Sequence, residues 1–227
     1  MILLAVISLP DSKNQKLEFA KYLLQLEPSS KRSASGKFDY LYSNASYSIA
    51  DIMLEKASGL SYEELLDKYI VKALGLELFI GWPYKINKDQ PWGHYQNQDK
   101  SLEIIGPDSD YALNPLINAA GNLSMKSEDF AKFVQFYLRG LIGENTHLRS
   151  ESLQYIHLKI LGYNTLHGKS YSHFDGSTGI FYARGLVIPE SDFGLSIITN
   201  SGSVEPVDYI TAKLAKARYK LWWRLWE

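Results

Sequence analysis

The chain has 227 residues and a mass of 25.8 kDa, and 45% of its residues are apolar, which is enough to bury a hydrophobic core. Its 24 lysines and arginines nearly balance its 25 aspartates and glutamates, and the formal net charge of −1 argues against general binding to nucleic acid. The absence of cysteine excludes a disulfide framework, thiolate zinc sites, iron–sulfur ligation and a cysteine nucleophile, without fixing the compartment.

The first part of the chain is predicted to be helical. Residues 1–7 form an apolar run that is too short to span a bilayer and has no basic residues before it, so we expect buried structure rather than a signal. Residues 17–26 carry spaced leucines, and residues 47–58 repeat isoleucine and methionine on one face before a glycine. The sequence Ser61-Tyr-Glu-Glu64 predicts a capping box that begins a helix ending at Gly75.

The middle of the chain changes from an irregular segment to helices and then to strands. Residues 82–118 show no sustained period, so we expect a long loop that is functional or packs as an irregular wall. Helices are predicted from Ser127 to about Gly140 and over 150–157. Segments rich in β-branched and aromatic residues then predict an antiparallel meander of three strands, over 169–174, 180–188 and 193–199.

A closing helix from Val207 has an apolar stripe opposite its lysines, and we expect it to cover the sheet. The stripe consists of Val207, Ile210, Leu214, Ala217, Leu221 and Leu225. Residues 220–226 contain three tryptophans and two basic residues, a composition that also suits a membrane surface. Packing on the sheet is the favoured interpretation, because tryptophans are as useful there as at lipid.

Motifs for phosphate or metal binding are missing from the sequence. No glycine-rich phosphate loop or dinucleotide fingerprint occurs, and the glycines of Gly176-Ser-Thr-Gly179 are too few to count as one, so the sequence implies no cofactor. The histidines lack the paired spacing of metal ligands, so we expect no metal. They are His94, His147, His157, His167 and His173.

The most informative segment is Tyr42-Ser43-Asn44, which stands just before the helix predicted over 47–58. This Tyr-x-Asn set resembles the second motif of the serine β-lactamase-like family, which includes class C β-lactamases, D-Ala-D-Ala carboxypeptidases and related esterases. The resemblance continues in the family's order and covers nearly the whole chain. Its further blocks are residues 61–64, 119–124, 129–133 and 195–200.

The resemblance implies a role for two residues of this motif. Tyr42 would relay protons between the nucleophile and the leaving group, and Asn44 would form a hydrogen bond with the acyl amide of the substrate. The residue types alone allow a second interpretation, in which Tyr42 and Asn44 finish a turn and cap a helix.

Acyl transfer of this kind needs an active-site serine and a lysine one helical turn later, in the pattern Ser-x-x-Lys. None of the serines in this chain has a lysine three residues on. Residues 3–11 resemble a degraded copy of the segment that follows Ser-x-x-Lys in the family, so the resemblance implies an N-terminally truncated member. A gene fragment, an alternative start and a half whose other half is encoded separately all remain open.

The third family motif is Lys or His, a small residue and Gly, on a strand that lines the cleft. The register His173-Phe174-Asp175 keeps the histidine but loses the glycine, whereas Phe174-Asp175-Gly176 keeps the glycine but loses the cation. Successive residues of a strand face opposite sides of the sheet, so His173 can be a site residue in only one register.

Three more residues are candidate substrate ligands by the same resemblance. Gly176 and Ser177 belong to the third-motif segment, and Asn200 matches a position after the last strand that often contacts the substrate carboxylate. An asparagine followed by Ser201 and Gly202 is equally ordinary turn chemistry.

We therefore expect an α+β fold of the β-lactamase/transpeptidase type, in a single partial domain over residues 1–227. Residues 45–160 would form the helical and loop wall of a cleft for a small-molecule or peptide substrate, and residues 165–227 the three-stranded meander and terminal helix. In complete family members, N-terminal strands complete the sheet. This chain should then keep an exposed edge and be marginally stable, or associate with itself or with another chain.

Three functional hypotheses follow. The first is a serine hydrolase by descent, which transfers acyl groups from amides or esters through an acyl-serine but is catalytically incomplete as written. The second is a non-catalytic domain that binds a peptidoglycan peptide or a protein partner. The third is a working hydrolase whose nucleophile comes from another polypeptide or from Ser8 or Ser12, although neither serine has the required lysine.

Overall fold

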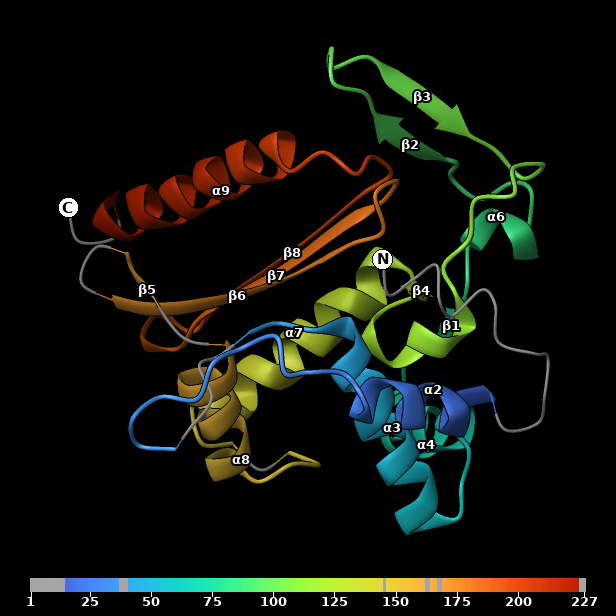
Figure 1. The fold of residues 1–227 in the computed structure, drawn as a ribbon. Helices are drawn as coiled ribbons and strands as arrows, with labels where there is room; N and C mark the ends of the chain where they lie inside the picture. Colours follow the sequence, from blue (N-terminus) through green and yellow to red (C-terminus); the bar gives the residue numbers. More distant parts are fainter. Residues whose placement is uncertain (1–14, 37–40, 145, 162–163, 167–168, 225–227) are drawn as a thin grey trace.

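The computed structural model describes residues 15–36, 41–144, 146–161, 164–166 and 169–224 (Figure 1). Its α-helices are α2 (Gln15–Leu24), α3 (Asn44–Ser58), α4 (Tyr62–Leu66), α5 (Lys72–Leu74), α6 (Pro83–Ile86), α7 (Ser127–Leu141), α8 (Ser150–Tyr155) and α9 (Glu205–Arg224). Its strands are β1 (Leu78–Ile80), β2 (Gly93–Gln96), β3 (Leu102–Ile105), β4 (Leu123–Met125), β5 (Asn164–Leu166), β6 (Lys169–Ser177), β7 (Tyr182–Ile188) and β8 (Phe193–Thr199). Two π-helical turns, η1 (Asp67–Val71) and η3 (Ile156–Leu161), and two 3₁₀ turns, η2 (Pro115–Ala120) and η4 (Pro189–Ser191), complete the described elements.

The main sheet is antiparallel, with the strand order β5-β6-β7-β8. The predicted meander is present, but the structure adds β5, so the described sheet has four strands where the sequence predicted three. The short strand β5 pairs only with the start of β6, from Lys169 to Tyr171, and its three residues carry no strong sequence signal. The strand predicted from Ile180 begins at Tyr182, because Phe181 donates its backbone N–H to the Thr178 hydroxyl in a turn.

Helices cover both faces of this sheet, with α9 above it and α7 below it in Figure 1. On the lower face, the ring of Phe174 from β6 packs edge-on against Phe130 and Tyr137 of α7. The buried core here also includes Val134, Leu138, Leu141, Leu153 and Val187. This packing of helices on an antiparallel sheet confirms the predicted α+β fold of β-lactamase/transpeptidase type.

The closing helix α9 covers the upper face, as predicted, but it is rotated relative to the predicted stripe. Val207 is fully buried and Ala215 is 5% exposed, whereas Ile210 and Leu214 are 39% and 43% exposed. The buried positions are two helical turns apart, so they define the face that meets the sheet. An ion pair between Asp208 of α9 and a sheet arginine fixes this rotation, and the sequence pattern contains no sign of it. The side chains from residue 219 onward are outside the described ones.

The helices before the sheet begin and end at the capping residues of their own sequence. Helix α3 begins after the N-cap Ser43 and ends at Gly59, whose φ of 71° is in the left-handed region. The predicted capping box is confirmed, because the Ser61 hydroxyl accepts from the Glu64 N–H while the Glu64 carboxylate accepts from the Ser61 N–H. The helix that follows runs to Gly75 as predicted, with the π-helical turn η1 inside it.

The segment predicted as irregular, residues 82–118, contains short elements packed around one aromatic cluster. Trp82 donates its indole N–H to the carbonyl of Tyr111 and stacks on Phe181. The β2–β3 hairpin projects from this cluster beside the end of the main sheet (Figure 1). Among the described helices, none is both long and apolar enough to cross a membrane.

Candidate functional site

The Tyr42–Asn44 corner lies at the start of helix α3. The Tyr42 hydroxyl donates to the side-chain oxygen of Asn44 at 2.8 Å, and the Tyr42 side chain is 57% exposed. The helix cap comes from the residue between them, since the Ser43 hydroxyl accepts from the N–H of Ser46. The corner therefore places a tyrosine hydroxyl beside an asparagine amide, and the two are hydrogen-bonded to each other.

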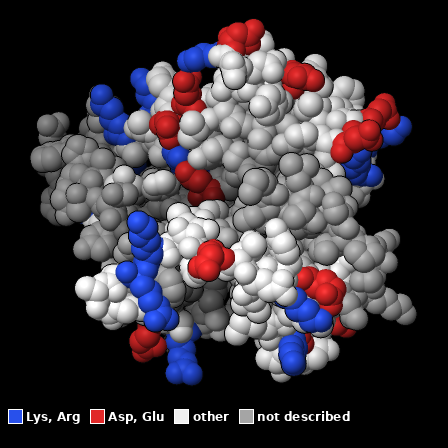
Figure 2. Space-filling model, in the orientation of Figure 1, with Lys and Arg blue, Asp and Glu red and all other residues white. Residues whose placement is uncertain are grey.

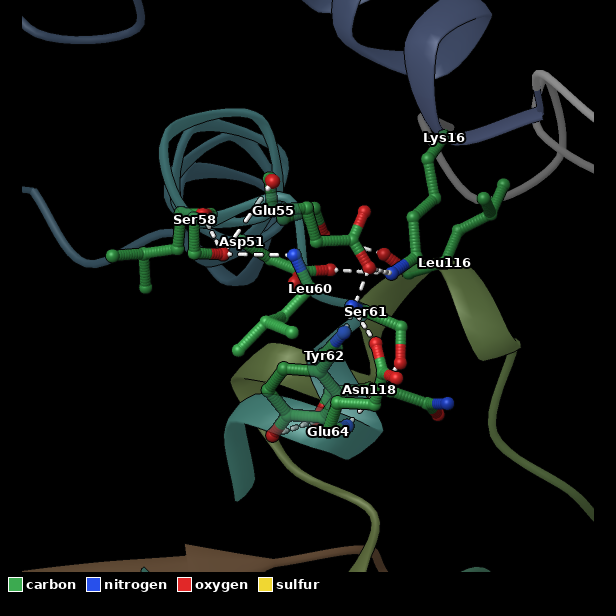
Figure 3. A network of polar contacts seen from close by, with 12 residues as sticks. Lys16, Asp51, Glu55, Ser58, Leu60, Ser61, Tyr62, Glu64, Leu116 and Asn118 are labelled. Atoms are coloured by element: carbon green, nitrogen blue, oxygen red, sulfur yellow. Dashed lines mark hydrogen bonds and ion pairs between the residues drawn. The ribbon is translucent and has the colours of Figure 1, made fainter. Parts of the chain in front are cut away.

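A polar network that sequence reasoning missed joins α2, α3 and the start of α4 (Figure 3). The Lys16 ammonium of α2 contacts Asp51 at 2.8 Å and Glu55 at 2.7 Å, both on α3. Glu55 also accepts the backbone N–H of Tyr62 at 2.9 Å, so one carboxylate holds both α2 and the start of α4. The i,i+4 spacing of Asp51 and Glu55 signals a shared helix face, but nothing in the sequence identifies Lys16 as their partner.

Burial controls the electrostatics of this network. Asp51 is only 5% exposed, one of its carboxylate oxygens has no hydrogen-bond partner, and burial raises its pKa despite the neighbouring ammonium. Burial lowers the pKa of Lys16, but its hydrogen bonds to Asp51 and Glu55 outweigh that effect and raise it. Burial, with a smaller effect of the Asp51 charge, raises the pKa of Tyr62 to about 12. The network is a charged clamp between α2, α3 and α4.

The third-motif segment lies on β6, and the structure resolves which way its residues face. Phe174 packs into the α7 side of the sheet, among Phe130, Phe133 and Tyr137. Its neighbour therefore faces the α9 side. There, the Nδ1 atom of His173 lies 3.4 Å from a carboxylate oxygen of Asp175. If the motif begins at His173, its first side chain faces α9. If it begins at Phe174, its first side chain faces α7.

Asp175 belongs to a second ionic cluster, between the sheet and α9. Its carboxylate accepts hydrogen bonds from Arg184 at 2.8 and 2.7 Å and from the Tyr182 hydroxyl at 2.8 Å. Arg184, whose side chain is 9% exposed, also contacts Asp208 of α9 at 2.6 Å. Burial alone would raise the pKa of Asp175, but the hydrogen bonds from Arg184 and Tyr182 hold it below its usual value. Arg184 inside the apolar stretch 180–188 signals a buried cation that needs acidic partners, but the sequence does not identify Asp175 and Asp208 as those partners.

Three candidate residues lie at the same end of the main sheet, but on different strands. Ser177 pairs with Tyr182, which pairs on its other side with Thr199. Gly176 and Ser177 therefore lie about two strand spacings, or roughly 10 Å, from Asn200. The Ser177 hydroxyl accepts from the N–H of Gly179 and so shapes the adjoining turn.

The side chain of Asn200 binds the segment that begins the β2–β3 hairpin and does not point into open space. The side-chain amide of Asn200 donates to the backbone carbonyl of Trp92 at 3.1 Å, and the backbone carbonyl of Asn200 accepts from the His94 ring at 2.8 Å. A methyl group added at Gly176 would meet nothing within 4 Å, so this position borders open space.

The described contacts do not bring all the predicted site residues together. Tyr42 and Asn44 bond to each other at the start of α3, which packs against α2 and η2, whereas His173, Gly176 and Ser177 lie on β6. The segment 3–11, including Ser8, and also Ser12 and residues 38–40 lie outside the described residues. Within the described part of the chain, no group of three or more metal-ligating side chains occurs.

An apolar cavity of about 660 Å³ lies on the α7 side of β6, between α5, α7 and α8. It is lined by Tyr69, Ile70, Ala73, Leu74, Phe133, Phe136, Tyr137, His147, Leu148, Leu153, Ile156 and Phe174. On the face shown in Figure 2, acidic and basic side chains of the described residues are interspersed. This face therefore offers a mixed-charge surface.

Comparison with known proteins identifies the fold. The family model described as Beta-lactamase matches residues 5–218. An octameric penicillin-binding protein homologue from Pyrococcus abyssi superposes with a TM-score of 0.66 at 21% identity, over 93% of this chain and 47% of that one. A class C β-lactamase from Rhodobacter sphaeroides has a TM-score of 0.58 at 15% identity, over 91% and 68% of the two chains.

A D-stereospecific amidohydrolase from Streptomyces sp. gives a TM-score of 0.57 at 18% identity, over 72% of this chain and 51% of that one. No curated protein matches the sequence. The chain thus spans about half the length of the solved structures first matched, and these likenesses establish the fold alone. Because the family model covers nearly all of the residues, the chain belongs to the β-lactamase family.

Proposed function

We propose that residues 1–227 are a β-lactamase-related serine hydrolase domain that is catalytically incomplete on its own. The reaction of its lineage is acyl transfer from an amide or ester: a serine oxygen attacks the carbonyl carbon, the leaving group takes a proton, and water then hydrolyses the acyl-serine. The observation that carries the proposal is the absence of any serine with a lysine three residues later.

The positions of the remaining candidates support this proposal. A proton relay must approach the nucleophile to within hydrogen-bond distance, about 2.6–3.2 Å, and the Tyr42 hydroxyl donates to Asn44 at 2.8 Å. On β6, His173 lies beside Asp175 on the α9 side, and Phe174 occupies the α7 side. Turnover would require a serine and a lysine that these 227 residues do not pair at the necessary spacing.

The experiment is a hydrolysis assay of the purified chain with a chromogenic cephalosporin and a p-nitrophenyl ester, alongside the Tyr42→Phe variant. We expect both proteins to match the buffer rate, because the variant removes only a hydroxyl that has no nucleophile to serve. Turnover above buffer that falls by about a hundredfold in Tyr42→Phe, the size expected for a lost proton-transfer group, would contradict the proposal.

A further inference from the structure

Helix α9 meets the main sheet along a narrow face (Figure 1). Up to residue 217, its least exposed side chains are those of Val207, Thr211 and Ala215, which follow one another at intervals of four residues. Since each residue turns the helix by about 100°, these three positions span only about 80° of its circumference. Most of the helix surface therefore faces away from the sheet.

An apolar row lies beside the face that meets the sheet. It consists of Ile210, Leu214 and Ala217, whose spacing of four and three residues places them on one side of a helix. All three residues belong to the stripe that was expected to cover the sheet. The structure turns them outward instead, because Ile210 is 39% exposed, Leu214 is 43% exposed and Ala217 is also exposed.

A basic row adjoins the apolar row. Lys213 and Lys216 are exposed on α9, and Lys220 and Arg224 continue the same spacing along the sequence. Residues 209–224 contain five basic residues and no acidic one, although the whole chain has a formal net charge of −1. Positive charge is therefore concentrated on this helix.

The two acidic residues of α9 lie in its first turn, and both are occupied within the protein. Glu205 contacts the Lys100 ammonium of the β2–β3 hairpin at 3.0 Å. Asp208 contacts the Arg184 guanidinium of β7 at 2.6 Å. These carboxylates each neutralise a cation from another element, so they do not offset the charge of the basic row.

The lysines of the basic row point to a partner outside the protein. In the part of the chain that the structure describes, neither Lys213 nor Lys216 forms an ion pair, and the Lys213 ammonium lies over the ring of Tyr209 at 5.2 Å. The Tyr209 side chain is itself 64% exposed. An anionic surface could thus approach both lysines without displacing a carboxylate.

An anionic lipid surface matches both rows at once. Lysine side chains can keep their ammonium groups among acidic headgroups while neighbouring apolar side chains enter the boundary of the acyl chains. Tyrosine and tryptophan are enriched at this boundary, and the sequence has Tyr209 and three tryptophans within 220–226. A nucleic acid would use the basic row but would leave the apolar row in water.

We propose that the apolar row and the basic row of α9 bind the surface of anionic lipid membranes. The helix would lie in the plane of the headgroups, with the main sheet on its other side. This inference is independent of the proposed function, because it rests on α9 and not on the candidate catalytic residues.

Co-sedimentation of the purified chain with lipid vesicles tests the proposal. One set of vesicles is made of phosphatidylcholine, and the other contains phosphatidylcholine and phosphatidylglycerol in equal parts. We expect binding to the anionic vesicles to be stronger by about tenfold or more, because each basic residue near such a surface strengthens binding by about fivefold. Added salt should reduce this difference by screening the charges.

Two pairs of lysines separate the basic row from the overall charge. Lys213→Gln combined with Lys216→Gln removes two positive charges from α9 and should weaken binding to anionic vesicles by about twentyfold. The control combines Lys72→Gln with Lys126→Gln, whose side chains are 73% and 68% exposed on other parts of the chain. It removes the same charge and should change binding by less than about threefold.

Two pairs of apolar residues test the apolar row in the same way. Ile210→Ser combined with Leu214→Ser should weaken binding to anionic vesicles by about tenfold or more, because it removes apolar surface from the membrane contact. The control combines Leu102→Ser with Ile104→Ser on β3, which are 53% and 60% exposed, and should bind like the unmodified chain. Circular dichroism confirms that each variant is folded.

Three results would overturn the proposal. The first is equal binding of the unmodified chain to both kinds of vesicle, including no binding to either. The second is equal weakening by the two lysine pairs, because net charge alone would then explain the attraction. The third is a loss of binding in the β3 variant but not in the α9 variants, because the hairpin would then be the contact.

Discussion

The guanidinium of Arg184 binds both carboxylate oxygens of Asp175, through Nε at 2.8 Å and Nη2 at 2.7 Å. This bidentate pair explains why an aspartate stands in the third-motif segment: it holds β6 to β7 and, through Asp208, to α9. Neither oxygen of Asp175 is therefore a free group for chemistry at the sheet edge.

Arg184→Met should destabilise the fold by about 2–4 kcal/mol at pH 7, because it leaves the partly buried Asp175 without its cation. The pKa of Asp175 is held below the ordinary 3.8, so the pair stabilises the fold fully above that pH and loses its effect as the pH falls through the lower, folded-state pKa. The deficit of the variant should accordingly shrink at acid pH. Urea unfolding between acid pH and pH 7 measures the loss of unfolding free energy. As a control, Lys126→Met removes an exposed ion pair with Glu77 and should cost less than about 0.5 kcal/mol.

Lys16→Met should destabilise the fold by about 1–3 kcal/mol at pH 7, because the buried Asp51 would keep its charge without a partner. Burial already raises the pKa of Asp51, so its ionisation costs stability as the pH rises through the folded-state value, and loss of Lys16 raises that pKa further. The deficit should therefore grow from pH 4 to pH 7. Lys21→Met removes an exposed pair with Glu18 from the same helix, and an equal loss there would refute the role of the clamp.

The two glycines near the end of the sheet should respond oppositely to alanine. A methyl group at Gly202 would lie 2.0 Å from the backbone oxygen of Gly179, so Gly202→Ala should cost about 2 kcal/mol or more. At Gly176 the same group meets open space, and Gly176→Ala should change stability by less than about 1 kcal/mol. Thermal unfolding of both variants compares them, and equal losses would mean that the backbones of Gly179 and Gly202 are not in contact.

Tyr137→Phe should leave stability unchanged or raise it by up to about 1 kcal/mol. The Tyr137 hydroxyl is buried without a hydrogen-bond partner, and its burial raises the pKa of the group to about 12. Removing an unsatisfied polar group from an apolar site removes its desolvation cost. A loss above about 1 kcal/mol in chemical denaturation would mean that the hydroxyl has a partner in solution.

Features fixed by adjacent residues could be predicted from the sequence. The Ser61 capping box depends on a hydroxyl and a carboxylate three residues apart, and the strand Phe193–Thr199 depends on its own β-branched run, so both appear where predicted. Strand β5 has only three residues and forms because β6 offers an edge, and the π-helical turn η1 has no local signature. Neither was predicted.

The candidate site was harder to predict because it depends on tertiary partners. Alternation along β6 showed that His173 and Phe174 face opposite ways, but the aromatic side chains of α7 and the cation of Arg184 determine which side each takes. The clamp of Lys16 on Asp51 joins residues 35 positions apart, and the rotation of α9 depends on Asp208 meeting Arg184. These contacts are visible only once the chain is folded.

We propose that the chain carries no activated serine, and covalent labelling is the decisive measurement. Purified chain, shown to be folded by circular dichroism, is incubated with a fluorescent penicillin and with a fluorophosphonate, and its intact mass is measured. We expect the unmodified mass of 25.8 kDa with both reagents. A stoichiometric adduct that disappears in Tyr42→Phe would contradict it and would identify a nucleophile within these 227 residues.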